Sequence, residues 1–306
     1  MRWTIEMRRR RIRSSAPWIG FAMCLCVGTA QAHEFWVEPS TFALERGGLL
    51  AVRLCVGDGF EGWSLARNTG RIELFAAAGP AGQQPVVGLD GADPAGVARL
   101  ATDGGYVIAY RSNRAFTEMP AAKFEAYLRD KGLDKILALR GQRGANRAGT
   151  REAYSRHSKA LIRVGGGVGD IADRRMGLRL ELIADPDRYS AAGKDLRSFQ
   201  LLYEGKPLAG ALVKATRPGT ADDDLQLRTD AQGRASFRLS APGMWRIAAV
   251  HMIKAPRDVA ADFESLWASL TFEIPPQSST AGQDAAVARP PACSNKIAPS
   301  TLQARR

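Results

Sequence analysis

Histidine is scarce in this chain, and so is cysteine once the first residues are set aside. The 306 residues include three histidines and four cysteines, and Cys24 and Cys26 lie close to the N-terminus. The other two cysteines, Cys55 and Cys293, do not form a C-x-x-C pair. This spacing excludes a thioredoxin-like motif and a zinc site of paired thiolates. Whether Cys55 and Cys293 form a disulfide stays open, because sequence does not give the geometry that such a bond needs.

Motifs of common enzyme classes are also missing. The sequence has no G-x-S-x-G elbow, no P-loop, no H-E-x-x-H and no Rossmann glycine fingerprint. A Ser-His-Asp site would have to use His157 or His251, and no serine near either of them is in a context that favours a nucleophile. We therefore expect a protein without enzymatic activity.

Long apolar runs are absent, although a short one follows a positively charged N-terminus. The first 13 residues contain six arginines, an apolar stretch of 11 residues spans Trp18–Gly28, and Ala30-Gln31-Ala32 follows. This is the pattern of a cleaved secretory signal over residues 1–32, and the stretch is too short for a stable membrane anchor. We expect a periplasmic protein, cleaved after Ala32 and without a transmembrane anchor after cleavage.

The net charge gives little support for nucleic-acid binding. The chain carries +12, but residues 1–32 hold six arginines and one glutamate, so their removal lowers the net charge to +7. The remaining basic residues do not form a dense stripe with interleaved aromatic residues, which nucleic-acid-binding sequences show. We expect an ordinary solvated surface and no nucleic-acid partner.

Short apolar segments between turn-forming residues predict an N-terminal β domain over residues 33–176. The expected strands are 34–37, 49–56, 71–76 and 105–110. Apolar residues at three- and four-residue spacings between 120 and 140 indicate two short helices. We expect the helical insert to run from about 120 to 158 and to cover the sheet.

Residues 177–274 predict a second β domain. Leu178, Leu180 and Leu182 alternate with charged residues, as in a half-buried strand. Further short strands follow at roughly ten-residue spacing, which is typical of a sandwich. The predicted fold class is therefore mainly β, with two antiparallel β domains, the second an Ig-like or transthyretin-like sandwich. Residues 275–306 are rich in Pro, Ser, Ala and Gln and are expected to be disordered.

Several segments resemble one protein family. They are "AHEFWVEPSTF", "FEAYLRDKGLDKIL", "YSRHSKALIRVG", "GKPLAGALVKA", "LRTDAQGRASFRL", "MWRIAAVHM" and "ADFESLWASLTFE". Together they resemble an uncharacterised family of exported bacterial proteins, commonly labelled the periplasmic component of a cobalt/nickel ABC-type transport system. The resemblance covers about residues 33–273 and implies transition-metal handling with a membrane metal transporter as partner. It brings no established catalytic residues.

The phrases G-x-P-L-x-G-A-x-V and T-D-x-x-G are also similar to those of transthyretin-like and collagen-adhesin modules, which agrees with a sandwich.

Cleavage after Ala32 makes His33 the first residue of the mature chain. His33 then offers its α-amine and an imidazole nitrogen in one chelate ring. A second imidazole completes a three-nitrogen site that suits Cu(II), and also Ni(II) or Co(II). The α-amine has a pKa of about 7.7–8.0, so its proton is lost at little cost when a metal binds.

His251 is the preferred second ligand, because it ends a strand-like run and precedes Met252, a soft sulfur ligand. A hydrogen-bonded histidine at the edge of a core is the alternative interpretation. Asp262 and Glu264 are candidates to orient the His251 imidazole.

Glu34 and His157 are weaker candidates for metal ligands. His157 lies between Arg156 and Lys159, whose positive charges disfavour a bound cation, and a solvated helix is its simpler setting. Asp58 and Glu61 in the "GDGFEG" segment offer oxygen ligands, but their spacing is not that of an EF-hand. We expect a solvated turn there.

These observations favour a periplasmic, non-enzymatic protein that binds or delivers nickel, cobalt or copper through His33 and His251. One alternative is a β-sandwich module that binds a ligand or protein without a metal. The other is a copper-dependent oxidative enzyme, because polysaccharide monooxygenases also use an N-terminal histidine with a second histidine.

Overall fold

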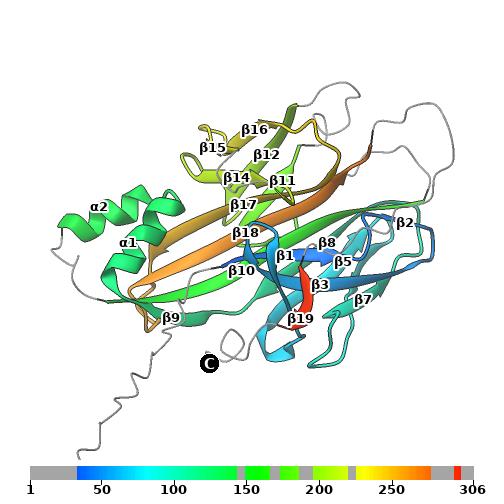
Figure 1. Cartoon of the computed structure of the whole chain (residues 1–306), viewed down its shortest axis with the longest axis horizontal. Coiled ribbons are helices and arrows are strands. Elements are labelled where there is room, and N and C mark those ends of the chain that lie inside the picture. The colour runs from blue at the N-terminus through cyan, green and yellow to red at the C-terminus, as the bar shows by residue number, and fades with distance from the viewer. Residues whose placement is uncertain are drawn as a thin grey trace, which may run out of the picture. The chain divides into compact units, whose positions relative to one another are not determined.

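β-strands dominate the computed structural model (Figure 1), which describes residues 33–142, 149–165, 173–185, 196–219, 225–276 and 293–297. The expected signal peptide lies outside the described residues. None of the helices in the described ranges is long and apolar enough to cross a membrane. The prediction of a mainly β fold with a short helical insert is confirmed.

Within the described residues the strands form three sheets, which we call A, B and C. Sheet A contains β1 (Glu34–Pro39), β3 (Leu49–Asp58), β4 (Glu61–Leu65), β7 (Gly96–Arg99) and β19 (Ser294–Ile297). Sheet B contains β2 (Ala43–Leu44), β5 (Ile72–Gly79), β6 (Gly82–Pro85), β8 (Gly104–Ser112), β9 (Ala115–Met119), β10 (Thr150–Val164), β14 (Leu212–Thr216), β15 (Gln226–Arg228), β17 (Gly243–Lys254) and β18 (Phe263–Ile274). Sheet C contains β11 (Leu180–Ala184), β12 (Leu196–Tyr203), β13 (Lys206–Pro207) and β16 (Arg234–Arg238).

Sheet B is the middle layer, because both of its faces are buried. On β8, Tyr106 and Ile108 pack into the core shared with sheet A, whereas Val107 and Ala109 pack into the core shared with sheet C. Successive side chains of a strand point to opposite faces. We call the side of sheet B toward sheet A "face A" and the side toward sheet C "face C".

Two short helices cover another part of face A. They are α1 (Ala121–Asp130) and α2 (Asp134–Gln142), and a 3-10 turn, η1 (Thr69–Arg71), precedes β5. Phe124 and Leu128 of α1 pack with Val250 and Met252 of β17 in a separate apolar cluster. The insert is therefore a packing element on sheet B.

The expected helical insert was too long at its C-terminal end. Residues 150–158 lie in β10, a strand of 15 residues, and residues 143–148 lie outside the described residues. The segment contains many charged side chains, which suggested a solvated helix. Instead, Glu152, His157 and Lys159 are buried between layers.

Sheet B crosses the boundary that was expected near residue 177. Glu152–Ala160 of β10 pairs with Phe263–Thr271 of β18, and this pairing is parallel rather than antiparallel. The halves of the chain therefore share one sheet instead of forming two separate β domains. The reason is that β10 and β18 are buried on both faces and need neighbours on both edges.

Part of the tail that was expected to be disordered is ordered. β19 pairs with β4, and Cys293 forms a disulfide with Cys55 of β3. Composition alone missed this, because a covalent link fixes a segment that buries little apolar surface by itself.

Candidate functional site

His33 lies at the start of β1, beside the turn between β3 and β4. Glu34 pairs with Gly57, so the preceding residue comes next to Asp58. The backbones of β3 and β4 are very close here: a Cβ at Gly57 would lie 2.0 Å from the carbonyl oxygen of Glu61. Glycine is the residue that permits such an approach.

The His33 imidazole contacts the carboxylate of Asp58. Nδ1 of His33 is 3.2 Å from Oδ2 of Asp58, and the two side chains are 15% and 55% exposed. The ring also meets Trp63 edge-on, with 6.0 Å between ring centroids. A small ion in solution can therefore reach both groups.

The electrostatic setting keeps Asp58 ionised. The hydrogen bond from His33 lowers the pKa of the Asp58 carboxyl below its ordinary value and outweighs the opposing effect of burial. Lys131 adds to the lowering, while Asp130 works against it. At neutral pH this position thus offers a carboxylate beside an imidazole.

Glu34, a weaker candidate ligand, is already engaged by two cations. Its Oε1 accepts from Nζ of Lys131 at 3.3 Å, and its Oε2 accepts from Arg246, which is 1% exposed. Lys131 also pairs with Asp130 at 2.8 Å, which in turn pairs with Lys214 at 2.9 Å. A metal at Glu34 would have to displace these cations.

A small hollow borders these ion pairs. Its lining includes Glu34, Lys131, Lys214, Val250 and Trp267, and its volume is about 20 Å³. This volume holds about one water molecule, far less than small-molecule ligand pockets of about 300–1,000 Å³. The hollow is therefore too small for a small-molecule ligand.

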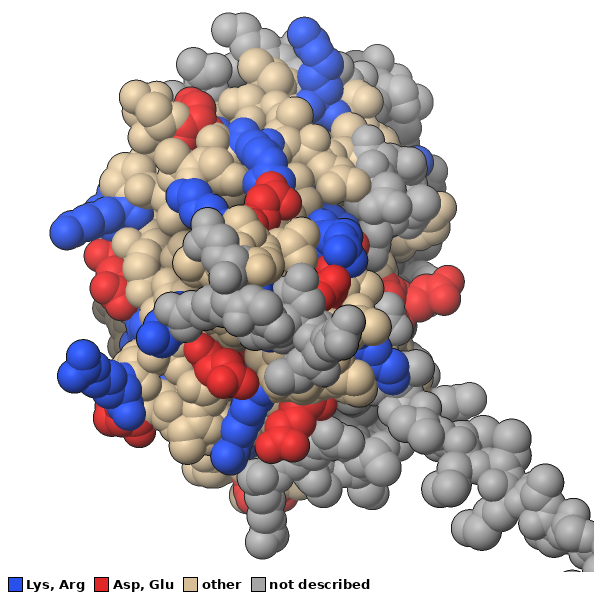
Figure 2. Space-filling model, turned by 90° about the vertical axis from the view of Figure 1, so that its left-hand side faces the viewer, with Lys and Arg blue, Asp and Glu red and all other residues tan. Residues whose placement is uncertain are grey.

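The helix-bearing side of the molecule carries both signs of charge. Figure 2 shows that, among the described residues on this side, Lys and Arg side chains lie among Asp and Glu side chains and form no continuous basic surface. Opposite charges so close together cancel much of each other's field at a distance.

The structure places His251 away from His33. His251 is on face C, where its ring packs on Tyr203 with 4.6 Å between centroids. Its neighbour Arg246, an odd number of residues away on β17, is on face A and contacts Glu34 of β1. Sheet B thus separates the two histidines. Met252 is on face A but is buried under the helices, in the cluster with Phe124.

His157 is a buried strand residue and not a solvated helix residue. It lies on β10, is 2% exposed, and its Nε2 is 3.0 Å from Oγ of Ser155. Burial lowers the pKa of the His157 imidazole to about 3, and the charges of Arg179 and Arg111 add to the lowering. At neutral pH the ring is uncharged.

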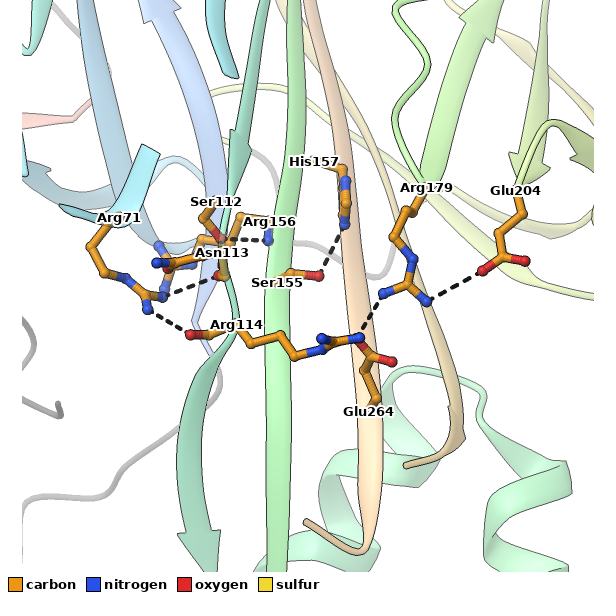
Figure 3. A network of polar contacts seen from close by, with 10 residues as sticks. All are labelled: Arg71, Ser112, Asn113, Arg114, Ser155, Arg156, His157, Arg179, Glu204 and Glu264. Atoms are coloured by element: carbon orange, nitrogen blue, oxygen red, sulfur yellow. Dashed lines mark hydrogen bonds and ion pairs between the residues drawn. The ribbon is translucent and has the colours of Figure 1, made fainter. Parts of the chain in front are cut away.

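Glu264 belongs to the surroundings of His157 and does not orient His251. Figure 3 shows its carboxylate between Arg114 and Arg179, each of which donates to Oε1 at 2.7 Å. Burial favours a higher pKa for Glu264, but the two guanidinium groups hold it below the ordinary value. Asp262, the other expected orienting residue, accepts from the backbone N–H of Arg151.

One further group of potential metal ligands occurs in the described part of the chain. Glu38, Cys55 and Cys293 lie within ligand reach of one another and are all buried. The disulfide uses both sulfur atoms, and Glu38 accepts from Nε1 of Trp36 and from the backbone N–H of Cys293. While the disulfide is intact, this group offers no thiolate.

Comparison with known proteins gives a family. Residues 30–253 match the family described as "Domain of unknown function (DUF4198)". The chain belongs to the DUF4198 family. No curated protein matches it.

A solved structure with some similarity to this DUF4198 chain is the "D0-D1 domain of Intimin". It is 12% identical, the match covers 78% of this chain and 97% of that one, and the TM-score is 0.19. A TM-score of this size supports no argument about function.

The charged side chains around Glu34 in this DUF4198 chain could not be found from the sequence alone. Lys131, Lys214 and Arg246 come from three separate elements, and only the packing of α1, β14 and β17 around β1 brings them together. Asp58 had been noticed as an oxygen ligand in a turn. Its nearness to His33 could have been found by pairing residues 34–39 with residues 52–57 as neighbouring strands.

Proposed function

We propose that this is an exported transition-metal-binding protein whose site consists of His33, as the first residue of the mature chain, and Asp58. The observation that carries the proposal is the contact between the His33 imidazole and the Asp58 carboxylate at a partly exposed strand start. The site lies immediately after the expected cleavage position.

The donor set defines the class of metal. His33 supplies its α-amine and imidazole in one chelate ring, and Asp58 supplies a carboxylate oxygen in place of a second imidazole. Two nitrogens and one oxygen suit Ni(II), Co(II) or Cu(II), with other positions left for water or a partner's ligand. Binding strengthens as pH rises through about 7.7–8.0, because the α-amine must lose its proton.

The role that fits such an open site is reversible metal binding or delivery without catalysis. The resemblance to proteins labelled as periplasmic components of cobalt/nickel transport makes a membrane metal transporter the partner to test first.

The two alternatives differ from this proposal in their requirements. A copper-dependent oxidative enzyme would need a second imidazole beside His33, and His157 and His251 are both on β-strands of sheet B, on face C. A binding module without a metal requires that metal titrations give no His33-dependent signal.

The test begins with the N-terminal sequence of the exported protein, followed by calorimetric titration with Cu(II), Ni(II) and Co(II). We expect His33→Ala to abolish tight binding and Asp58→Asn to weaken it by roughly 10-fold to 100-fold. A chain that retains Ala32 before His33 loses the amine chelate and should bind as poorly as His33→Ala.

His251→Ala is the matched control, and we expect it to bind as the wild type does. Equal affinity of the wild type, His33→Ala and the chain that begins at Ala32 would refute the proposal and favour a module without a metal. Loss of binding in His251→Ala alone would refute the site assignment.

A further inference from the structure

A lysine and two carboxylates meet inside the protein between sheets B and C. Lys159 lies on face C of β10, and its Nζ is 2.7 Å from Oδ1 of Asp173 and 3.4 Å from Oε1 of Glu181. The side chains of Lys159, Asp173 and Glu181 are 1%, 0% and 3% exposed. Water therefore has almost no access to the three charged groups.

This arrangement is electrostatically expensive. Each buried ion loses its hydration, and the mutual attraction of a pair offsets that loss only partly. Two carboxylates facing one ammonium group also leave an excess negative charge. Conversion of Lys159 and Asp173 into a neutral amide would remove one positive and one negative charge from this interior.

Two backbone N–H groups donate hydrogen bonds to the Asp173 carboxyl and fix its position beside Lys159. Its Oδ2 accepts from the N–H of Ala184 at 2.8 Å, and its Oδ1 accepts from the N–H of Arg174 at 2.7 Å. Donors fixed around a carboxyl group stabilise the negative charge that develops on oxygen when a nucleophile adds to the carbon. The guanidinium of Arg174 is itself anchored to the carbonyl of Gly79 on β5.

Glu181 lies where a proton carrier is needed. Its Oε1 is close to Nζ of Lys159 and accepts from the N–H of Met176 at 2.6 Å, while Oε2 accepts from the N–H of Leu178 at 3.3 Å. These bonds fix the carboxylate beside the nitrogen that must lose protons. A positioned carboxylate of this kind is a suitable general base and acid.

We propose that Lys159 and Asp173 condense into an intramolecular isopeptide bond with Glu181 as the catalytic proton carrier. A proton passes from the ammonium group of Lys159 to the Asp173 carboxylate, which gives a neutral amine and a carboxylic acid. The amine lone pair forms a bond to Cγ of Asp173. Glu181 takes a proton from the nitrogen and returns it to Oδ1, the Cγ–Oδ1 bond breaks, and one water molecule leaves. No oxidant, reductant or cofactor takes part.

The bond would join β10 of sheet B to the segment that leads into β11 of sheet C. It is independent of the proposed metal site, which lies on the other face of sheet B.

Intact mass spectrometry of the reduced, folded wild-type protein tests the proposal. We expect a mass lower by one water molecule than the sequence requires, and a branched peptide joining Lys159 to Asp173 after digestion. A full sequence mass, with Lys159 and Asp173 in unlinked peptides, would overturn it.

Two variants test the mechanism. Glu181→Gln should keep the full mass, and a fully linked Glu181→Gln would overturn the role of Glu181. Asp173→Asn keeps the shape of the side chain and should lose one ammonia molecule instead of water, which identifies the attacked carbon even if Glu181→Gln does not fold.

A second lysine–aspartate pair, Lys214 with Asp130, is an internal control for the proposed bond. Nζ of Lys214 is 2.9 Å from Oδ1 of Asp130, almost the same spacing, but the Asp130 side chain is 49% exposed. Burial raises the pKa of the Asp130 carboxyl, but Lys131 and Lys214 hold it below the ordinary value, so this pair should remain unlinked. A link that maps to Lys214 and Asp130 and not to Lys159 and Asp173 would overturn the argument from burial.

Discussion

The two faces of β10 each bury an ionisable group, and burial shifts the pKa values of the two groups in opposite directions. On face A, the Glu152 carboxylate accepts from Tyr127 of α1 and from Ser265. On face C, the His157 ring forms a hydrogen bond with Ser155. Neither residue forms an ion pair among the described residues. Burial raises the pKa of Glu152 to about 7 and lowers the pKa of His157 to about 3.

The difference shows that burial without a counter-ion favours the neutral form of either kind of group. Because both groups lie on β10, the free energy of unfolding falls when the pH is lowered and also when it is raised. Acid disfavours the folded state through His157, and alkali disfavours it through Glu152. Where partners of opposite charge are present, as around Asp130, the charged forms persist at the same sheet.

The largest expected effect concerns His157. Its folded pKa of about 3 is below the unfolded value of 6.5. Stability is therefore complete above pH 6.5 and falls as the unfolded chain takes up a proton, by about 5 kcal/mol down to pH 3. His157→Gln should remove about 2 kcal/mol of the loss between about pH 7 and pH 5 in urea unfolding.

His251→Gln serves as the control, because His251 is less buried, and it should keep most of the acid sensitivity. An acid sensitivity that is the same in His157→Gln and wild type would contradict the assignment.

A second comparison sets Lys159 on face C, whose carboxylate partners are buried, against Lys214 on face A, whose partner Asp130 is half exposed. Relative to protein in which Lys159 and Asp173 are not linked, Lys159→Met leaves Asp173 and Glu181 buried without a cation, and we expect a loss of about 3–5 kcal/mol in the free energy of unfolding. Lys214→Met leaves Asp130 half exposed and still paired with Lys131, and we expect a loss below about 1 kcal/mol. Denaturant titration of both variants measures the contrast, and similar losses would show that the two faces do not differ.

The third prediction concerns Glu152 on face A. Its folded pKa of about 7 is above the unfolded value of 4.5, so its contribution is complete below pH 4.5 and is lost as pH rises to about 7. The loss amounts to about 3 kcal/mol. Glu152→Gln still accepts from Tyr127 and Ser265, and it should raise the free energy of unfolding above about pH 7 but not near pH 4.5. The same gain at both pH values would point to packing instead of titration.

Much of the fold could be predicted from the sequence, because alternation of apolar side chains reports strands directly. The main wrong prediction concerned residues 150–158, which were expected in the helical insert and lie in β10. His157 and Lys159 look solvated in a linear sequence, and only the packing of β11 and β18 supplies Glu181 and the other groups that surround them. The domain boundary failed for the same reason, since parallel pairing of β10 with β18 joins segments about a hundred residues apart.

The candidate site was predictable in part. The expected cleavage motif drew attention to His33, and the turn sequence drew attention to Asp58. His251 was correctly placed on a strand, but strand alternation does not reveal which layer each face meets. Which face of β17 lies toward β1 depends on how the three sheets pack together. The face toward β1 carries Arg246 and not His251.

The parallel pair of β10 and β18 also sets an order of events during synthesis. β10 ends at Val164, whereas its partner β18 begins at Phe263. A ribosome must add almost a hundred residues before the central edge of sheet B can be covered. Until then the Glu152–Ala160 edge exposes unpaired backbone groups, which are a template for joining another chain. A chain that stops before residue 263 is therefore expected to aggregate, and a factor that shields this edge would be needed most while the second half is being made.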